Sequence, residues 1–339
     1  MASLVFALMA RQLEELEEPS EAGGLGMNET MGMPPMQPEL PYGYIPNEAL
    51  GIMFIALFGV STVLHFGQAL YFRTWFLLPT AVLCGAGELI GWVARVWSSS
   101  EPYADTPFKM QISTTIIAPT PLLAASFIIF SRIVRQLGPE YSLLPARWYA
   151  WVFVSCDLVA LVVQGVGGGL ASAAVTLDEA NKGSDIMLGG IGFQFAVVIL
   201  FTLLVADFLI RRQISRPWRP AAADATPAPT LIPTRTKVML YGLAFSTLVF
   251  IVRSVYRVVE LAEGWGGRII RTEVYFNALD GAMIVLAIFT WNFVHPGWFL
   301  PAPAATASDN EKDGHEKAKN SDETRTSVAR SSIDVTVAV

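Results

Sequence analysis

Ionisable side chains occur inside the long apolar blocks of this sequence, where a charge is costly. On insertion scales, a charged residue at the middle of a membrane-spanning helix costs about 2.5 to 3.5 kcal/mol, so it commonly faces a partner or a polar cavity. These residues, together with one amide, are Glu88, Arg95, Asp157, Gln164, Arg253, Arg257, Glu260 and Asp280. Carboxylate and guanidinium groups that share a buried cavity would hold a charged or hydroxylated head group, and we take these eight residues as the candidate substrate-binding site.

The spacing of these residues gives each helix one polar side, because positions i, i+4 and i+7 share a face. The sets are Glu88 with Arg95, Asp157 with Gln164, and Arg253 with Arg257 and Glu260. At about 1.5 Å of rise per residue, Glu88, Arg253 and Asp280 reach a similar depth, ~20 to 24 Å from the cytoplasmic face. This predicts one nearly charge-balanced cluster between the second, sixth and seventh spans. The alternative is a set of ion pairs that only locks the helices together.

The sequence contains none of the common catalytic or metal-binding patterns. Its three His residues lack metal-ligand spacing, and Gly-x-Ser-x-Gly and phosphate-binding-loop motifs are absent. Cys84 and Cys156 lie in apolar blocks, which favours small packing residues over a disulfide or a metal site. No basic patch interleaved with aromatic residues lies outside the blocks, which excludes nucleic-acid binding. We expect no metal, no cofactor and no enzymatic activity.

The elements that must position these residues follow from composition. The 339 residues are 53% hydrophobic and only 15% charged, with a mean hydropathy of +0.46, whereas soluble domains carry about 25% charged residues. Blocks long enough to cross a bilayer core as helices, each of roughly 20 apolar residues, are 47–70, 75–97, 110–133, 148–174, 186–210, 238–260 and 274–294. The sequence therefore predicts an all-α polytopic membrane protein with a bundle of seven transmembrane helices.

Two of these blocks contain residues that disturb a regular helix. Pro119 and Pro121 are expected to break the third span, and Gly165 with the run 167–169 is expected to loosen the outer end of the fourth. Broken helices at membrane depth occur where they line a cavity or pack against protein. This favours a cavity, although a kink without any transport role is the alternative.

The orientation follows from the distribution of Lys and Arg, because positive charge stays on the cytoplasmic side. Connections after spans one, three and five hold ten such residues: Arg73, Arg132, Arg135, Arg147, Arg211, Arg212, Arg216, Arg219, Arg235 and Lys237. The other connections hold four, which are Lys109, Lys182, Arg268 and Arg271. This predicts an N-terminus outside and a C-terminus in the cytoplasm.

Domain organisation follows the same division. Residues 1–46 form an acidic arm that we expect to be extracellular, and its only Asn-x-Ser/Thr sequon makes Asn28 a candidate glycosylation site. Residues 47–298 form the seven-helix transmembrane domain. Residues 299–339 are rich in Ser, Thr, Lys and Glu, which predicts a disordered cytoplasmic tail.

At these same residues the sequence resembles the fungal RTA-like family of lipid-translocating exporters. The matching segments are Gly-Glu-Leu-Ile-Gly-Trp-Val-Ala-Arg (87–95), Ile-Ala-Pro-Thr-Pro-Leu-Leu-Ala-Ala-Ser (117–126), Cys-Asp-Leu to Gln and the glycine run (156–169), Val-Arg-Ser-Val-Tyr-Arg-Val-Val-Glu (252–260), and Tyr-Phe to His-Pro-Gly (275–297). The resemblance covers about 250 residues and all seven spans. It implies a fungal source, a plasma-membrane or endomembrane location, and membrane lipids or amphiphilic small molecules as partners.

The leading functional hypothesis is a transporter that moves amphiphiles between leaflets. The resemblance implies cargo such as sphingoid long-chain bases or toxic amphiphiles, and a contribution to stress or toxin resistance. A seven-span receptor or membrane stress sensor has the same number of spans and the same orientation, and the basic stretch 211–219 could serve coupling to a protein partner. A membrane-embedded enzyme is the third alternative. The residues leave protein partners, oligomeric state and the energy source of transport open.

Overall fold

The computed structural model describes residues 40–220, 231–264 and 267–300, and these form helices with no strand among them. The predicted glycosylation site Asn28, most of the acidic arm and the tail from residue 301 lie outside the described residues. Within the described part, seven segments are long and apolar enough to cross a membrane. This confirms the predicted all-α fold with seven transmembrane helices.

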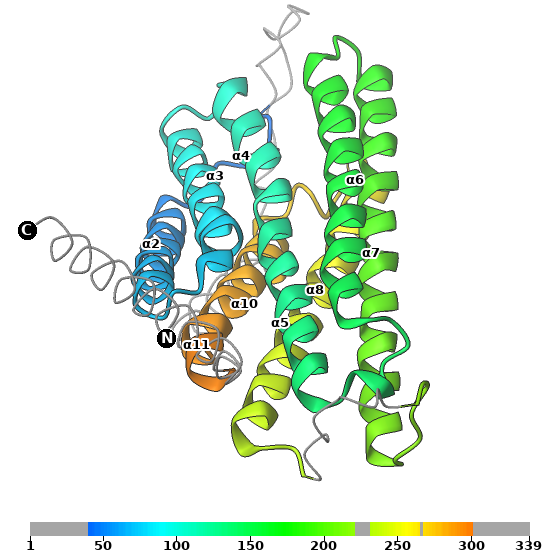
Figure 1. The fold of residues 1–339 in the computed structure, drawn as a ribbon. Helices are drawn as coiled ribbons and strands as arrows, with labels where there is room; N and C mark the ends of the chain where they lie inside the picture. The colour runs from blue at the N-terminus through cyan, green and yellow to red at the C-terminus, as the bar shows by residue number, and fades with distance from the viewer. Residues whose placement is uncertain (1–39, 221–230, 265–266, 301–339) are drawn as a thin grey trace, which may run out of the picture. The chain divides into compact units, whose positions relative to one another are not determined.

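The seven spans are built from the following elements. They are α2 (Glu48–Tyr71); η1 (Trp75–Leu77), η2 (Leu78–Val82) and α3 (Leu83–Ser100); α4 (Asp105–Ile117) and α5 (Pro119–Leu137); α6 (Ala146–Ala173); α7 (Leu177–Gln213); α8 (Thr234–Ala262); and α9 (Glu273–Phe276), η4 (Asn277–Gly281), α10 (Ala282–Phe293) and α11 (Pro296–Phe299). The short η3 (Pro139–Tyr141) joins α5 to α6. In Figure 1, α6 and α7 form an antiparallel pair on one side, α2 and α3 lie on the other, and α4 and α5 run between them.

The helix α7 begins nine residues before its predicted apolar block, at Leu177 rather than at residue 186. Its start is a capping box, in which the Thr176 hydroxyl accepts a hydrogen bond from the Glu179 amide at 3.3 Å and the Glu179 carboxylate accepts one from the Thr176 amide at 3.4 Å. Lys182 and Asp178 add an ion pair one turn apart, at 2.7 Å. A search for apolar windows misses such a polar start, so this prediction of the helix boundary was wrong.

The third span consists of two helices, and the break lies at the predicted prolines. The helix α4 ends at Ile117, and α5 begins with Pro119 in its first turn. Proline has no N–H to donate to the carbonyl four residues earlier, which for Pro119 is that of Thr115. The break therefore leaves a carbonyl oxygen inside the protein that needs another donor.

The glycines of α6 do not loosen it, because the helix continues to Ala173. One of them, Gly167, allows close packing instead. A Cβ atom added at Gly167 would lie 2.5 Å from the Met187 backbone nitrogen and 2.7 Å from the Gly183 carbonyl oxygen of α7. Only glycine permits the two helix backbones to approach this closely, as in membrane helix pairs with small residues at their interface. The expectation of a loosened helix end was therefore wrong.

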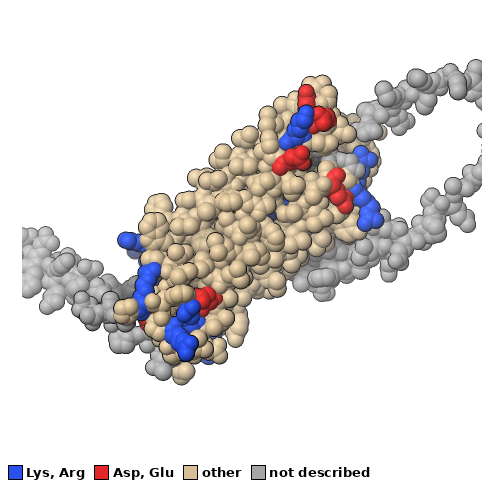
Figure 2. All heavy atoms as spheres, turned by 90° about the vertical axis from the view of Figure 1, so that its right-hand side faces the viewer, with Lys and Arg blue, Asp and Glu red and all other residues tan. Residues whose placement is uncertain are grey.

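The surface of the described part fits a lipid environment. Figure 2 shows that nearly all Lys, Arg, Asp and Glu on this face lie at the two ends, with a wide uncharged band between them. Large apolar side chains of the spans are exposed, among them Val63 of α2, Leu158 and Val162 of α6, Leu203 of α7 and Phe293 of α10. A wide band without charges, together with many exposed large apolar side chains, is unusual for a soluble protein. The aromatic core lies inside, where Phe127, Phe130, Phe153 and Phe201 pack together.

Candidate functional site

The charged residues of α8 and η4 form one buried ion-pair network. Arg257 donates two hydrogen bonds to Asp280, from Nε to Oδ1 at 2.9 Å and from Nη2 to Oδ2 at 2.7 Å. Its third nitrogen, Nη1, donates to Glu260 Oε2 at 2.8 Å. Tyr256 donates to the other oxygen of Glu260 at 2.7 Å. Every oxygen of both carboxylates is thereby paired, and bidentate pairing of this kind is the strongest form of charge-assisted hydrogen bonding.

Arg253 joins this network to the broken third span. Its Nε lies 2.7 Å from Asp280 Oδ1, and its Nη2 donates to the Thr115 carbonyl oxygen at 2.8 Å. This is the carbonyl that Pro119 leaves without a helical donor. Arg253 therefore supplies the missing hydrogen bond, and the proline break and the buried arginine belong to one arrangement. The π-helical turn η4 places Asn277 and Asp280 inside the protein together.

Glu88 lies beside the ion-pair network without a direct ion pair to it. It is 1% exposed, and Asp280, Arg253 and Arg257 are its charged neighbours. Among the described residues, its Oε1 atom has no hydrogen-bond partner. The charges of the two arginines and two carboxylates of the network already cancel. Glu88 is thus one acidic group in excess of this balance.

Arg95 forms a separate pair at one end of α3. Its Nη2 donates to the Tyr44 hydroxyl at 2.9 Å and to Glu273 Oε1 at 3.0 Å. Burial raises the pKa of Tyr44 to about 12, so this hydroxyl stays neutral and accepts the bond. The Phe276 ring separates this pair from the network, since its centroid lies 4.7 Å from the Arg95 guanidinium and 5.4 Å from that of Arg257. Sequence reasoning missed Glu273. An acidic residue in the first turn of the last span is a signal that could have identified it as a partner for a buried arginine.

Asp157 and Gln164 lie on α6, away from these charges, and form a polar track with α7 and α5. Gln164 Nε2 donates to Gln194 Oε1 at 3.1 Å, and Gln194 Nε2 donates to the Thr120 hydroxyl at 3.1 Å. Gln194 is also the polar side chain that faces Asp157. Asp157 is 2% exposed, and within the described residues neither of its carboxylate oxygens has a hydrogen-bond partner. Gln194, a lone amide in an apolar block, is the residue that sequence reasoning missed here.

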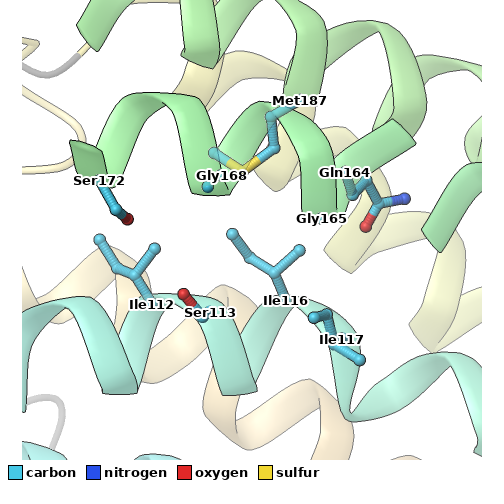
Figure 3. A pocket seen from close by; sticks show the side chains of 10 residues that line it. Ile112, Ser113, Ile116, Ile117, Gln164, Gly165, Gly168, Ser172 and Met187 are labelled. Atoms are coloured by element: carbon cyan, nitrogen blue, oxygen red, sulfur yellow. The ribbon is translucent and has the colours of Figure 1, made fainter. Parts of the chain in front are cut away.

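A cavity of ≈180 Å³ adjoins the polar track (Figure 3). Ile112 and Ile116 of α4 face Ser172 and Gly168 of α6 across it, and Met187 of α7 reaches in from the far side. Gln164 lines one end of the cavity, and its Oε1 atom has no hydrogen-bond partner among the described residues. Small-molecule sites commonly have apolar walls with a few convergent polar groups and volumes of about 300 to 1,000 Å³. This cavity has such a lining and is smaller, so it has room for part of an amphiphile.

The eight predicted site residues thus divide into three groups. Arg253, Arg257, Glu260 and Asp280 come together with Glu88 beside them, Arg95 pairs elsewhere with Glu273, and Asp157 and Gln164 belong to the polar track. The ion-pair network carries most of the charge, yet it uses nearly all of its hydrogen-bonding groups on itself. Beside the network, the Glu88 Oε1 atom and both polar side-chain atoms of Asn277 have no hydrogen-bond partner among the described residues, and Tyr256 borders an open hollow of ≈470 Å³. The polar track combines its unpaired polar atoms with the more enclosed cavity of ≈180 Å³.

The fold and the buried polar groups define an α-helical integral membrane protein with seven spans. Residues 81–303 match the family described as RTA1 like protein. The chain belongs to this family, as the sequence predicted.

Relatives with names support the same assignment. The chain is 30% identical over 281 residues to the sphingoid long-chain base transporter RSB1 of Saccharomyces cerevisiae. The aligned region covers 76% of this chain and 73% of the relative. It is 25% identical over 305 residues to the lipid-translocating exporter-like protein RTA1 of Leptosphaeria maculans (81% and 56%). It is 26% identical over 294 residues to protoporphyrin uptake protein 1 of Saccharomyces cerevisiae (74% and 90%). No solved structure matches.

Proposed function

We propose that this protein moves a single-chain amphiphile, such as a sphingoid long-chain base, between the two leaflets of a membrane. The names of the relatives support a transporter of lipids or amphiphiles rather than an enzyme, and their three names share cargo that is largely apolar. The membrane lipid or amphiphile is then the partner of the protein, and resistance to toxic amphiphiles is the expected phenotype.

The cavity beside Gln164 is the observation that carries this proposal. The walls formed by Ile112, Ile116 and Met187 suit an alkyl chain, while the free Oε1 of Gln164 suits a hydroxyl or an ammonium group. An amphiphile that crosses a bilayer needs both environments within one protein, because its head group loses water on the way. The ion-pair network offers no comparable free acceptor on its two paired carboxylates.

The orientation that we predict from the Lys and Arg bias would put this cavity in the outer half of the membrane. With the N-terminus outside, as the Lys and Arg bias favours, α6 runs from the cytoplasm outward, and Gln164 lies seven residues, or about 10 Å, beyond Asp157. Export to the outer leaflet of the plasma membrane is the role that fits this placement, with an endomembrane as the alternative location. Occupancy of Asn28 by a glycan would belong to the same topology.

Leaflet exchange in liposomes tests the proposal. Purified protein should accelerate exchange of a fluorescent long-chain base, and Gly168→Leu, which fills the cavity, should slow it by about tenfold or more, a change of roughly 1.4 kcal/mol. Gly192→Leu is the matched control, because an added Cβ at Gly192 has no neighbour within 4 Å. It should exchange the probe at close to the wild-type rate.

Two outcomes would contradict the proposal. If wild-type protein exchanges no amphiphile, the receptor or sensor hypothesis becomes the better one. If Gly168→Leu, folded by its thermal unfolding curve, exchanges the probe as fast as Gly192→Leu, transport uses another route through the protein.

A further inference from the structure

Asp157 is a buried carboxylate without a counter-cation. Both of its oxygens are inaccessible and lack hydrogen-bond partners among the described residues. The groups that face it are neutral, since Gln194 is its polar neighbour on α7 and Thr120 of α5 adjoins Gln194. By contrast, Asp280 contacts two guanidinium groups.

The charged side chains of the neighbouring helices are engaged elsewhere. On α4, Lys109 pairs with Asp105. On α7, Lys182 pairs with Asp178, Arg211 pairs with Asp207, and Arg212 donates to the Leu137 carbonyl oxygen. On α5, Arg132 stacks over the Phe76 ring at 4.2 Å and Arg135 donates to Ser131 at 3.2 Å. On α6 itself, Arg147 lies ten residues before Asp157 and is exposed. None of these cations forms an ion pair with Asp157 in the described part of the chain.

An isolated carboxylate at membrane depth must be neutralised, because an uncompensated buried charge is strongly unfavourable. Because no cation of the described residues pairs with Asp157, the neutralising partner that we consider is a proton or a cation that binds from outside. A primary ammonium group is such a cation, and it is the charged part of a long-chain base. The two states have the same net charge, so the site can exchange one partner for the other without a buried excess charge in either state.

We propose that Asp157 binds a proton and the ammonium group of the amphiphile in alternation, so that one proton leaves the site as one amphiphile enters. In this step the O–H bond of the carboxylic acid breaks, the proton passes to water, and the carboxylate forms an ion pair with the positively charged ammonium group. No oxidant or further reactant takes part. This inference rests on the proposed function, and it names the proton as the ion whose movement is coupled to transport of the amphiphile.

The polar track gives the head group a route to Asp157. An amphiphile in the cavity meets Gln164 first, and Gln194 links Gln164 to the surroundings of Asp157. The two amides can accept the hydrogen bonds of the ammonium and hydroxyl groups along about 10 Å of helix. A head group that moves along this track replaces water by fixed amide dipoles before it reaches the carboxylate.

The experiment uses full-length protein in liposomes and an N,N,N-trimethyl analogue of a fluorescent long-chain base. This analogue keeps its positive charge and has no proton to lose, so any linked proton comes from the protein. With the interior one pH unit more acidic, exchange of one cation for one proton should concentrate the analogue inside by about tenfold. A pH dye inside the vesicles should report loss of about one proton per analogue taken up.

Variants assign the effect to Asp157. Asp157→Asn cannot exchange a proton and should lose the gradient-driven accumulation completely, while its thermal unfolding temperature in detergent equals or exceeds that of the wild type. Asp185→Asn, an exposed carboxylate on the packed helix α7, is the matched control and should keep the accumulation. A folded Asp157→Asn protein that still accumulates the analogue tenfold would overturn the inference.

Wild-type protein alone also tests the inference, whatever the stability of the variants. If the wild-type protein equilibrates the analogue equally with and without the pH gradient, and the vesicles lose no proton, the proposed exchange of a proton for the amphiphile is wrong. The proposed transport function would still stand. If the protein moves neither the analogue nor the parent long-chain base under any gradient, the proposed function itself is wrong.

Discussion

Two of the regions that contain buried ionisable groups, the ion-pair network and the polar track, meet the energetic cost of burial in opposite ways. In the ion-pair network of α8 and η4, Arg257 and Asp280 pair through two hydrogen bonds of 2.7 and 2.9 Å. In the polar track of α5, α6 and α7, the neighbours of Asp157 are neutral, and its two oxygens have no hydrogen-bond partner within the described part of the chain. A region with many paired charges is therefore a weaker indication of a ligand-binding site than a single buried charge without a partner.

The ion-pair network and the polar track also differ in what they are expected to contribute to stability and to transport. In a fully paired network each ion pair compensates the cost of burying its charges. Loss of one partner lowers stability, because it leaves another charge buried without compensation. The unpaired carboxylate gives up stability and remains available to a ligand. The structure thus favours a locking role for the network that the sequence predicted as the binding site, and a ligand-binding role for the track.

The largest effect that this comparison predicts is on stability. Arg257→Leu removes the shared partner of Asp280 and Glu260 and should lower the free energy of unfolding by about 3 to 5 kcal/mol. Thermal unfolding in detergent, followed by size-exclusion chromatography, measures this. Arg147→Leu is the matched control, because Arg147 is exposed at the start of α6, and its change should stay within ~0.5 kcal/mol. Equal stability of the two variants would remove the distinction between the two regions.

A smaller effect is predicted where the polar track depends on helix packing. Gly167→Ala places a Cβ atom against the Gly183 carbonyl oxygen and should push α6 from α7, at a cost of about 1 to 3 kcal/mol. Because Gln164 and Gln194 bridge these helices, leaflet exchange should fall as well. Gly189→Ala has no neighbour within 4 Å of the added atom and should change neither property. Normal exchange by Gly167→Ala would show that transport does not need the track.

Much of the fold was predictable, because apolar length determines a membrane span directly. All seven spans were placed from hydropathy, and the errors lie at polar helix ends such as the capped start at Thr176, where hydropathy carries no information. The break at Pro119 was predicted from its missing N–H. Its consequence, that the freed Thr115 carbonyl accepts from Arg253, depends on which helices are neighbours.

The candidate site was predictable only as a list of residue types. Sequence spacing shows that Asp157 and Asp280 are both buried on polar helix faces, yet it does not show which of them meets an arginine. That outcome depends on helix rotation and on partners far along the chain, 138 residues apart for Arg253 and Thr115 and 74 for Gln194 and Thr120. The glycines of α6 illustrate the same limit, because a flexible helix end and a close helix contact have one and the same sequence signature.

The location of bound amphiphile tests the central claim most directly. A long-chain base with a photoreactive group near its amine, irradiated with the full-length protein in liposomes and mapped by mass spectrometry, should label residues 105–117 of α4 and 157–172 of α6. Gly168→Leu should abolish this labelling and Gly192→Leu should retain it. Labelling of α8 and η4 around Arg253 and Asp280 instead, unaffected by Gly168→Leu, would contradict the account, because it would place the cargo in the network that we describe as a lock.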